Sequence, residues 1–113
     1  MPRPSLIESA KPVPTRPRLE WSNEAGADLL AIVDRISDDN PDAAQELKDE
    51  IEAKVNALPE NPKMYAMSQR APGYRQMTVR PNYLVFYRLL TEDEPQIIDV
   101  AGVVHARRQW PTR

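Results

Sequence analysis

The chain has 113 residues, no cysteine and a formal net charge of −2. This length fits one domain that can be stable without a metal ion, and the lack of cysteine excludes disulfides and thiolate metal sites. No apolar run approaches the ~20 residues of a membrane span and no secretory signal is recognisable, so we expect a cytoplasmic protein.

The first segment, residues 1–17, contains five of the twelve prolines and shows no apolar periodicity. Proline fixes φ and has no N–H to donate to a sheet, so this segment is predicted to be extended or disordered. The folded domain is predicted to cover residues 18–113.

A short strand and a helix are predicted next. Residues 18–21 alternate polar and apolar side chains, which is typical of a strand. Ser22 is a candidate N-cap for a helix that ends near residues 37–39. Within it, Leu29, Val33 and Ile36 fall on one apolar stripe. We expect this stripe to be part of an apolar surface that a partner protein can cover.

A second helix is predicted from Asn40-Pro41, with asparagine as the N-cap and proline at the first helical position. Pro59 and Pro62 end its apolar pattern. Because about three residues join the two helices, they must form an antiparallel αα-hairpin. Its outer faces are acidic, since residues 20–60 carry twelve acidic side chains against three basic ones.

Three strands are predicted in the C-terminal third, over residues 74–79, 83–90 and 96–105, with a short acidic connection at residues 91–95. Gly102 interrupts an apolar face, which indicates a bulge or a close backbone approach. The predicted fold is α+β, in the order β-α-α-β-β-β. We expect an antiparallel sheet with the αα-hairpin packed on one face and the opposite face free.

The chemistry-bearing residues lie mainly in the same part of the chain, and residues 61–113 carry eight basic side chains against four acidic ones. Guanidinium groups suit phosphate and carboxylate partners, and we expect Arg75 and the basic cluster at residues 107–108 to share the free face of the sheet. His105 is the only histidine, either a proton shuttle or a strand-end residue bonded to the backbone. With no glycine-rich phosphate loop, nucleophile elbow or ligand cluster, no cofactor and no metal are expected.

Several segments together resemble the RelE/ParE toxin superfamily, over residues 18–111. The helical half matches in Asn40-Pro41-Asp42-Ala43-Ala44 and Leu58-Pro59-Glu60-Asn61-Pro62. The sheet half matches in Pro72-Gly73-Tyr74-Arg75, Tyr83-Leu84-Val85-Phe86-Tyr87-Arg88 and Val103-Val104-His105-Ala106-Arg107-Arg108-Gln109-Trp110.

This resemblance implies the toxin of a type II toxin–antitoxin pair, neutralised by a cognate antitoxin and linked to operator DNA only through that antitoxin. The RelE branch cleaves mRNA on the ribosome, whereas the ParE branch inhibits DNA gyrase. Ribonuclease members usually carry an arginine directly after the strand tyrosine, where this chain has Leu84. The chain therefore looks closer to the ParE branch, and inhibition of gyrase by binding is the leading hypothesis.

The resemblance also implies roles for single residues. For antitoxin binding, the stripe residues Leu29, Val33 and Ile36 are the candidates, with the sheet edge as the alternative. If the chain is instead a ribonuclease, Arg75 and Arg107 would stabilise phosphate charge and His105 would be the general acid or base. A third alternative is a degenerate member that binds its antitoxin but is not toxic. The candidates for target binding are Arg70, Arg75, Arg88, Arg107, Arg108 and Trp110.

Overall fold

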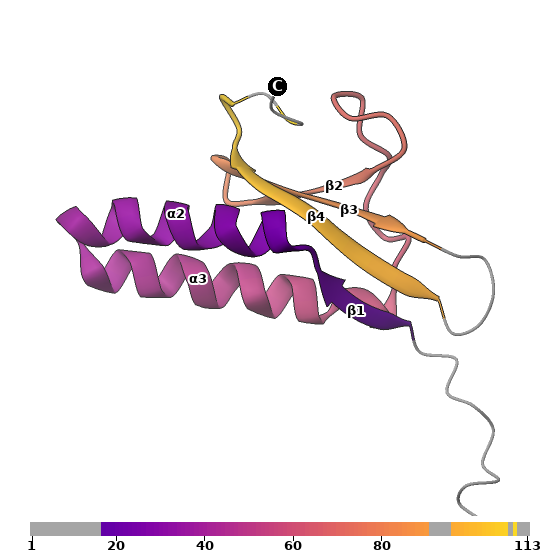
Figure 1. Ribbon diagram of the computed structural model, residues 1–113, viewed down its shortest axis with the longest axis horizontal. Coiled ribbons are helices and arrows are strands. Elements are labelled where there is room, and N and C mark those ends of the chain that lie inside the picture. The colour runs from indigo at the N-terminus through magenta and orange to yellow at the C-terminus, as the bar shows by residue number, and fades with distance from the viewer. Residues whose placement is uncertain (1–16, 91–95, 109, 111–113) are drawn as a thin grey trace, which may run out of the picture.

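The computed structural model describes residues 17–90, 96–108 and 110. The predicted N-terminal segment, apart from Pro17, and the connection at residues 91–95 lie outside these residues. Figure 1 shows two long helices side by side against one face of a twisted sheet. The elements are β1 (Arg18–Trp21), α2 (Asn23–Asp39), α3 (Pro41–Asn56), the 3₁₀ helix η1 (Leu58–Glu60), β2 (Arg75–Val79), β3 (Tyr83–Leu89) and β4 (Ile97–His105).

The sheet has the strand order β1-β4-β3-β2. Strand β3 pairs antiparallel with both β2 and β4, whereas β1 pairs parallel with β4, Arg18 lying opposite Ile97. The predicted α+β class and element order are confirmed, but the sheet is mixed and not antiparallel throughout. The reason is that α2 and α3 run antiparallel, so α3 brings the chain back along the sheet. Strand β2 therefore starts at the end of the sheet where β1 starts (Figure 1). Two further reversals then bring β4 into the direction of β1.

Both helices begin at the caps that the sequence predicts. The Ser22 hydroxyl accepts a hydrogen bond from Ala25 N–H at 2.9 Å, and the Asn40 side chain accepts one from Ala43 N–H at 3.1 Å. Each side chain satisfies one of the N–H groups that a helix start leaves unpaired. Pro41 occupies the first turn of α3, where its missing N–H costs nothing.

The larger core lies between the helices and the sheet. Leu47, Ile51 and Val55 of α3 pack there against strand residues that include Val85 and Tyr87. Of the apolar stripe on α2, Leu29 is buried, whereas Val33 and Ile36 are partly buried at its edge. Neither helix in the described part of the chain is long and apolar enough to cross a membrane.

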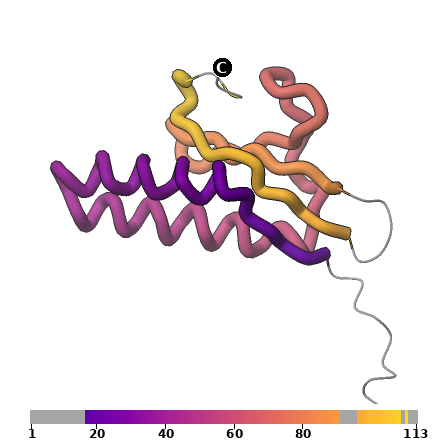
Figure 2. The backbone as a smooth tube through the Cα atoms, viewed as in Figure 1, coloured from indigo at the N-terminus to yellow at the C-terminus, as the bar shows by residue number. Residues whose placement is uncertain are grey.

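A second core covers the opposite face of the sheet, so the prediction of a free face is wrong. Leu84 and Phe86 point to this side, where Ala71, Tyr74 and Trp110 cover them. Figure 2 shows the segment before β2 and the C-terminal segment on the side away from the helices. The physical reason is that residues 84–87 of β3 are all apolar or aromatic, and a strand buried on both faces needs cover on both.

Gly102 combines the two features that its position predicts. The pairing of β3 with β4 shifts register between Phe86 and Tyr87, because Phe86 lies opposite Gly102 and Tyr87 opposite Val100. In addition, the indole of Trp110 lies on Gly102, where an added Cβ would stand 2.1 Å from Trp110 Nε1. The bulge and the close approach are therefore both present.

Candidate functional site

A pocket of about 440 Å³ lies between α2 and the C-terminal end of β4. We call it the α2–β4 pocket. Apolar side chains and charged side chains share its wall, which makes it suited to an amphipathic ligand. Its lining residues are Asp28, Ala31, Ile32, Arg35, Ile36, Tyr83, Val103, Val104, His105, Arg107 and Arg108.

The helical repeat places the α2 part of this wall. Residues three, four and seven positions apart lie on one face of a helix, which brings Asp28, Ile32 and Arg35 into one row. Asp28 also joins the helix to the sheet, since its Oδ2 accepts a hydrogen bond from Val103 N–H at 3.0 Å. Burial raises the pKa of the Asp28 carboxyl, the Val103 N–H acts against this, and the Glu24 carboxylate adds to the rise.

His105 closes the β4 side of the pocket. Its ring meets Tyr83 edge to face, with centroids 5.2 Å apart, and its Nδ1 accepts a hydrogen bond from Arg107 N–H at 3.1 Å. This backbone contact is one of the two alternatives that the sequence left open for His105. Because Nδ1 is an acceptor, the neutral ring carries its proton on Nε2.

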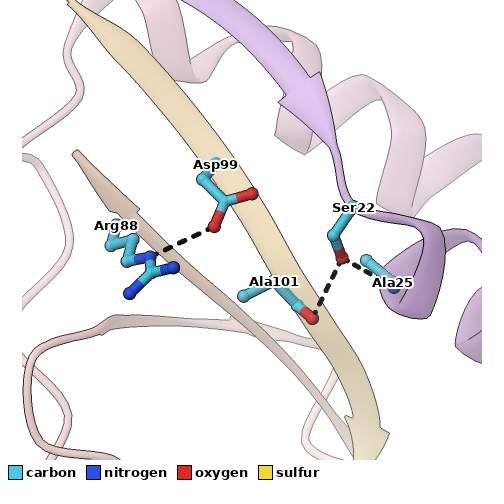
Figure 3. A network of polar contacts seen from close by, with 5 residues as sticks. All are labelled: Ser22, Ala25, Arg88, Asp99 and Ala101. Carbon is cyan, nitrogen blue, oxygen red and sulfur yellow. Dashed lines mark hydrogen bonds and ion pairs between the residues drawn. The ribbon is translucent and has the colours of Figure 1, made fainter. Parts of the chain in front are cut away.

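Three of the predicted arginines are engaged elsewhere by protein groups. Arg75 donates to the carbonyl of Tyr65 at 2.8 Å. Arg88 pairs with Asp99 at 3.1 Å (Figure 3), and its guanidinium lies 5.0 Å from the ring centroid of Tyr74. The Arg70 guanidinium donates to the carbonyl oxygens of Ala106 and Arg108. Each of these three side chains thus has a structural partner.

The structure does not bring Arg75 together with His105 and Arg107. Arg75 pairs in register with Tyr87, whereas His105 pairs with Tyr83, four residues away on β3. Four residues of strand span roughly 13 Å, and Arg75 is a further strand away on β2. The expected common face for Arg75 and the cluster at residues 107–108 is therefore not formed.

Trp110 and Arg88 lie on the far face of the sheet. The Trp110 ring is 5 % exposed, stacks on Phe86 with centroids 4.6 Å apart, and meets the edge of Tyr74 at 4.9 Å. These contacts cover most of the Trp110 side chain and hold it on the sheet. Of the six residues predicted for target binding, only Arg107 and Arg108 line the α2–β4 pocket.

The residues predicted for antitoxin binding are divided between two depressions on either side of α2. Ile36 lines the α2–β4 pocket, whereas Leu29 and Val33 line an apolar groove of about 370 Å³. We call this second depression the α2–α3 groove. Leu30 stands at this groove and is 61 % exposed, the highest value among the large apolar side chains of the described residues. The lining residues are Trp21, Gly26, Leu29, Leu30, Val33, Lys48 and Glu52.

The polar lining residues of the α2–β4 pocket that the sequence did not predict as site residues are Asp28, Arg35 and Tyr83. Arg35 carried a usable signal, because it is the only basic residue of α2 and lies seven positions after Asp28. Tyr83 gave none, since a strand tyrosine reads equally well as core. Among the described residues, no group of three His, Cys, Asp or Glu side chains is placed to hold a metal ion.

A family model described as the ParE toxin of type II toxin-antitoxin system, parDE, matches residues 19–110. The structure is similar to that of the chromosomal ParDE TA system from P. aeruginosa, with a TM-score of 0.69, 23% identity and coverage of 81% of this chain and 98% of that one. It also resembles YafQ from E. coli, with a TM-score of 0.57, 15% identity and coverage of 80% and 94%. None of the curated protein sequences matches significantly.

Proposed function

The chain belongs to the ParE toxin family of type II toxin–antitoxin systems, and we propose that it acts by binding its target, which is DNA gyrase. A cognate antitoxin neutralises it in this proposal. The likeness to solved structures supports the fold alone, so the proposed mode of action rests on the residues of this chain.

The observation that carries the proposal is the separation of Arg75 from His105 and Arg107, which the ribonuclease alternative would need at one site. Cleaving RNA through its own 2′-hydroxyl requires a group to take the proton and cations to stabilise the developing charge at the same phosphate. Here Arg75 is held by Tyr65 and lies far along the sheet from His105. Leu84, at the position where ribonuclease members usually carry arginine, is 4 % exposed within the second core. These placements favour a toxin that binds.

Antitoxin binding is supported by the α2–α3 groove. Leu29, Leu30 and Val33 offer an apolar strip with Lys48 and Glu52 at its edge. Such a strip suits the apolar face of a partner helix, with polar contacts around it. The exposed Leu30 side chain is the candidate anchor for this contact.

Ribosome-dependent mRNA cleavage is the second candidate, because His105 does share a pocket with Arg107 and Arg108. The two functions separate when the chain is expressed without an antitoxin. Growth arrest with intact transcripts and relaxed plasmid DNA supports gyrase inhibition. Arrest with cleaved transcripts and normal supercoiling overturns it, and no arrest at normal expression indicates a degenerate, non-toxic member.

A further inference from the structure

The arginines of the described part fall into two groups, according to whether their side chains have a partner within the protein. Five arginine side chains of the described part have a hydrogen-bond or ion-pair partner, namely Arg18, Arg70, Arg75, Arg80 and Arg88. Arg35, Arg107 and Arg108 have none among the described residues. All three of these line the α2–β4 pocket, although Arg35 lies on α2, far from Arg107 and Arg108 in the sequence.

Three cationic guanidinium groups around one concavity make its electrostatic potential positive, which favours an anionic ligand. The Asp28 carboxylate in the same wall does not supply this anion, because it is engaged by Val103 N–H and forms no ion pair with the three arginines. A guanidinium presents parallel N–H donors that match the two oxygens of a carboxylate or a phosphate. The pocket is thus suited to an anionic group from outside the described part of the chain.

The residues that line the pocket favour a protein carboxylate over a nucleic-acid phosphate as the ligand. Ala31, Ile32, Ile36 and Val103 give it an apolar lining, which fits the side chains beside an acidic residue of a peptide. A nucleic-acid backbone needs a continuous basic track, but α2 continues past the pocket with Asp34, Asp38 and Asp39. The ring of Tyr83 is also met by His105 and does not offer a free platform for a base.

We infer that the α2–β4 pocket binds an acidic side chain of the antitoxin, flanked by apolar residues that rest on Ile32 and Ile36. The inference rests on the proposed function, because it takes the antitoxin as the occupant. It also gives neutralisation a simple form. The bound segment covers Arg107 and Arg108, which the sequence predicts for target binding, so antitoxin and target exclude each other there.

The test uses the purified full chain and follows the arginine Nε–Hε signals by NMR. The probes are a blocked Leu-Glu-Leu peptide, its Leu-Gln-Leu match and a single-stranded oligonucleotide of twelve bases. We expect the glutamate peptide to shift the signals of Arg35, Arg107 and Arg108, and the glutamine peptide to bind at least about tenfold more weakly, since a charge-assisted contact is lost. Equal binding of both peptides, no binding of either, or stronger binding of the oligonucleotide to these arginines overturns the inference.

Two variants and one assay complete the test. Arg35→Gln is expected to weaken the glutamate peptide by about tenfold. Arg18→Gln, which alters an exposed arginine away from the pocket, is expected to leave the affinity within about twofold. A chain that inhibits gyrase but ignores the peptide overturns only the pocket assignment. A chain that binds the peptide but leaves gyrase active overturns only the proposed target.

Discussion

Trp110 lies flat against Phe86, with ring planes 11° apart, and its indole rests on the backbone of Gly102. The C-terminal segment thereby covers the face of the sheet that lies away from the helices. Arg107 and Arg108, which line the α2–β4 pocket, come three and two residues before Trp110 in the sequence. The contact of Trp110 on the far face and the α2–β4 pocket are therefore joined by a short stretch of the chain.

Gly102→Ala is expected to displace Trp110, because the added Cβ would lie 2.1 Å from its Nε1. Overpacking of this kind costs roughly 1–3 kcal/mol. Urea unfolding measures the loss, and tryptophan fluorescence reports the change around the indole. Gly26→Ala is the matched control, since nothing lies within 4 Å of its added Cβ and it is exposed in α2. It is expected to gain about 0.5–1 kcal/mol from helix propensity. Equal effects of the two substitutions contradict the close fit.

Ser22→Ala is expected to cost more stability than Asn40→Ala. Both residues cap a helix, and loss of a cap costs about 0.5–2 kcal/mol. Ser22 additionally donates to the Ala101 carbonyl at 3.3 Å, which joins the start of α2 to β4 (Figure 3). Asn40 is exposed and makes only its local cap. Thermal or urea unfolding of the two variants ranks them, and the reverse order would mean that the contact with β4 adds nothing.

The pH dependence of stability is expected to change when Asp28 is replaced. Burial raises the folded-state pKa of Asp28 above its ordinary value of 3.8, so the folded state holds this proton more tightly than the unfolded chain does. The stabilising contribution is therefore full below the unfolded pKa and is lost as the pH rises through the folded pKa. Asp28→Asn removes this loss and keeps an oxygen for Val103 N–H. At pH 7 it is expected to be at least as stable as the parent chain.

Asp28→Ala is the control for the hydrogen bond. It leaves the Val103 N–H without its acceptor inside the protein, which costs roughly 1–3 kcal/mol. Denaturant unfolding between pH 3 and pH 7 separates the two effects. An asparagine variant that loses as much stability as the alanine variant at pH 7 would show that the charge of Asp28 stabilises the fold.

His105→Ala is expected to leave growth arrest essentially unchanged, because a toxin that acts by binding needs no proton shuttle. The measurement is growth after induction, with expression and circular dichroism checked to show that the chain is folded. His105→Asn is a companion variant that places an oxygen near the position of Nδ1, where Arg107 N–H donates. Loss of arrest in both variants at normal folding would favour the ribonuclease alternative.

Local signals predicted most of the fold. Ser22 and Asn40 act as caps and Pro41 begins α3, each through contacts within a few residues. Gly102 marks a bulge and a close approach because it has no side chain. The cover on the second face was not predicted, because Trp110 reaches Phe86 across 24 positions of sequence and carries no local mark. The parallel pairing of β1 was missed for the same reason, since it depends on the path of the whole chain.

The site was predicted only in part. The run Arg107-Arg108 can be recognised from the sequence. That it shares a pocket with Arg35 follows only from the packing of α2 beside β4. Arg75 and Arg88 looked equally available, yet Tyr65 and Asp99 engage them in the folded chain. Which arginines remain without partners is a property of tertiary structure, and it is this property that identifies the pocket.

The most direct measurement is a supercoiling assay with purified gyrase and relaxed plasmid, run beside a translation reaction that reports cleavage of ribosome-bound mRNA. We predict that the purified chain inhibits supercoiling and leaves the mRNA intact at the same concentration. Cleaved mRNA together with unimpaired supercoiling would contradict it.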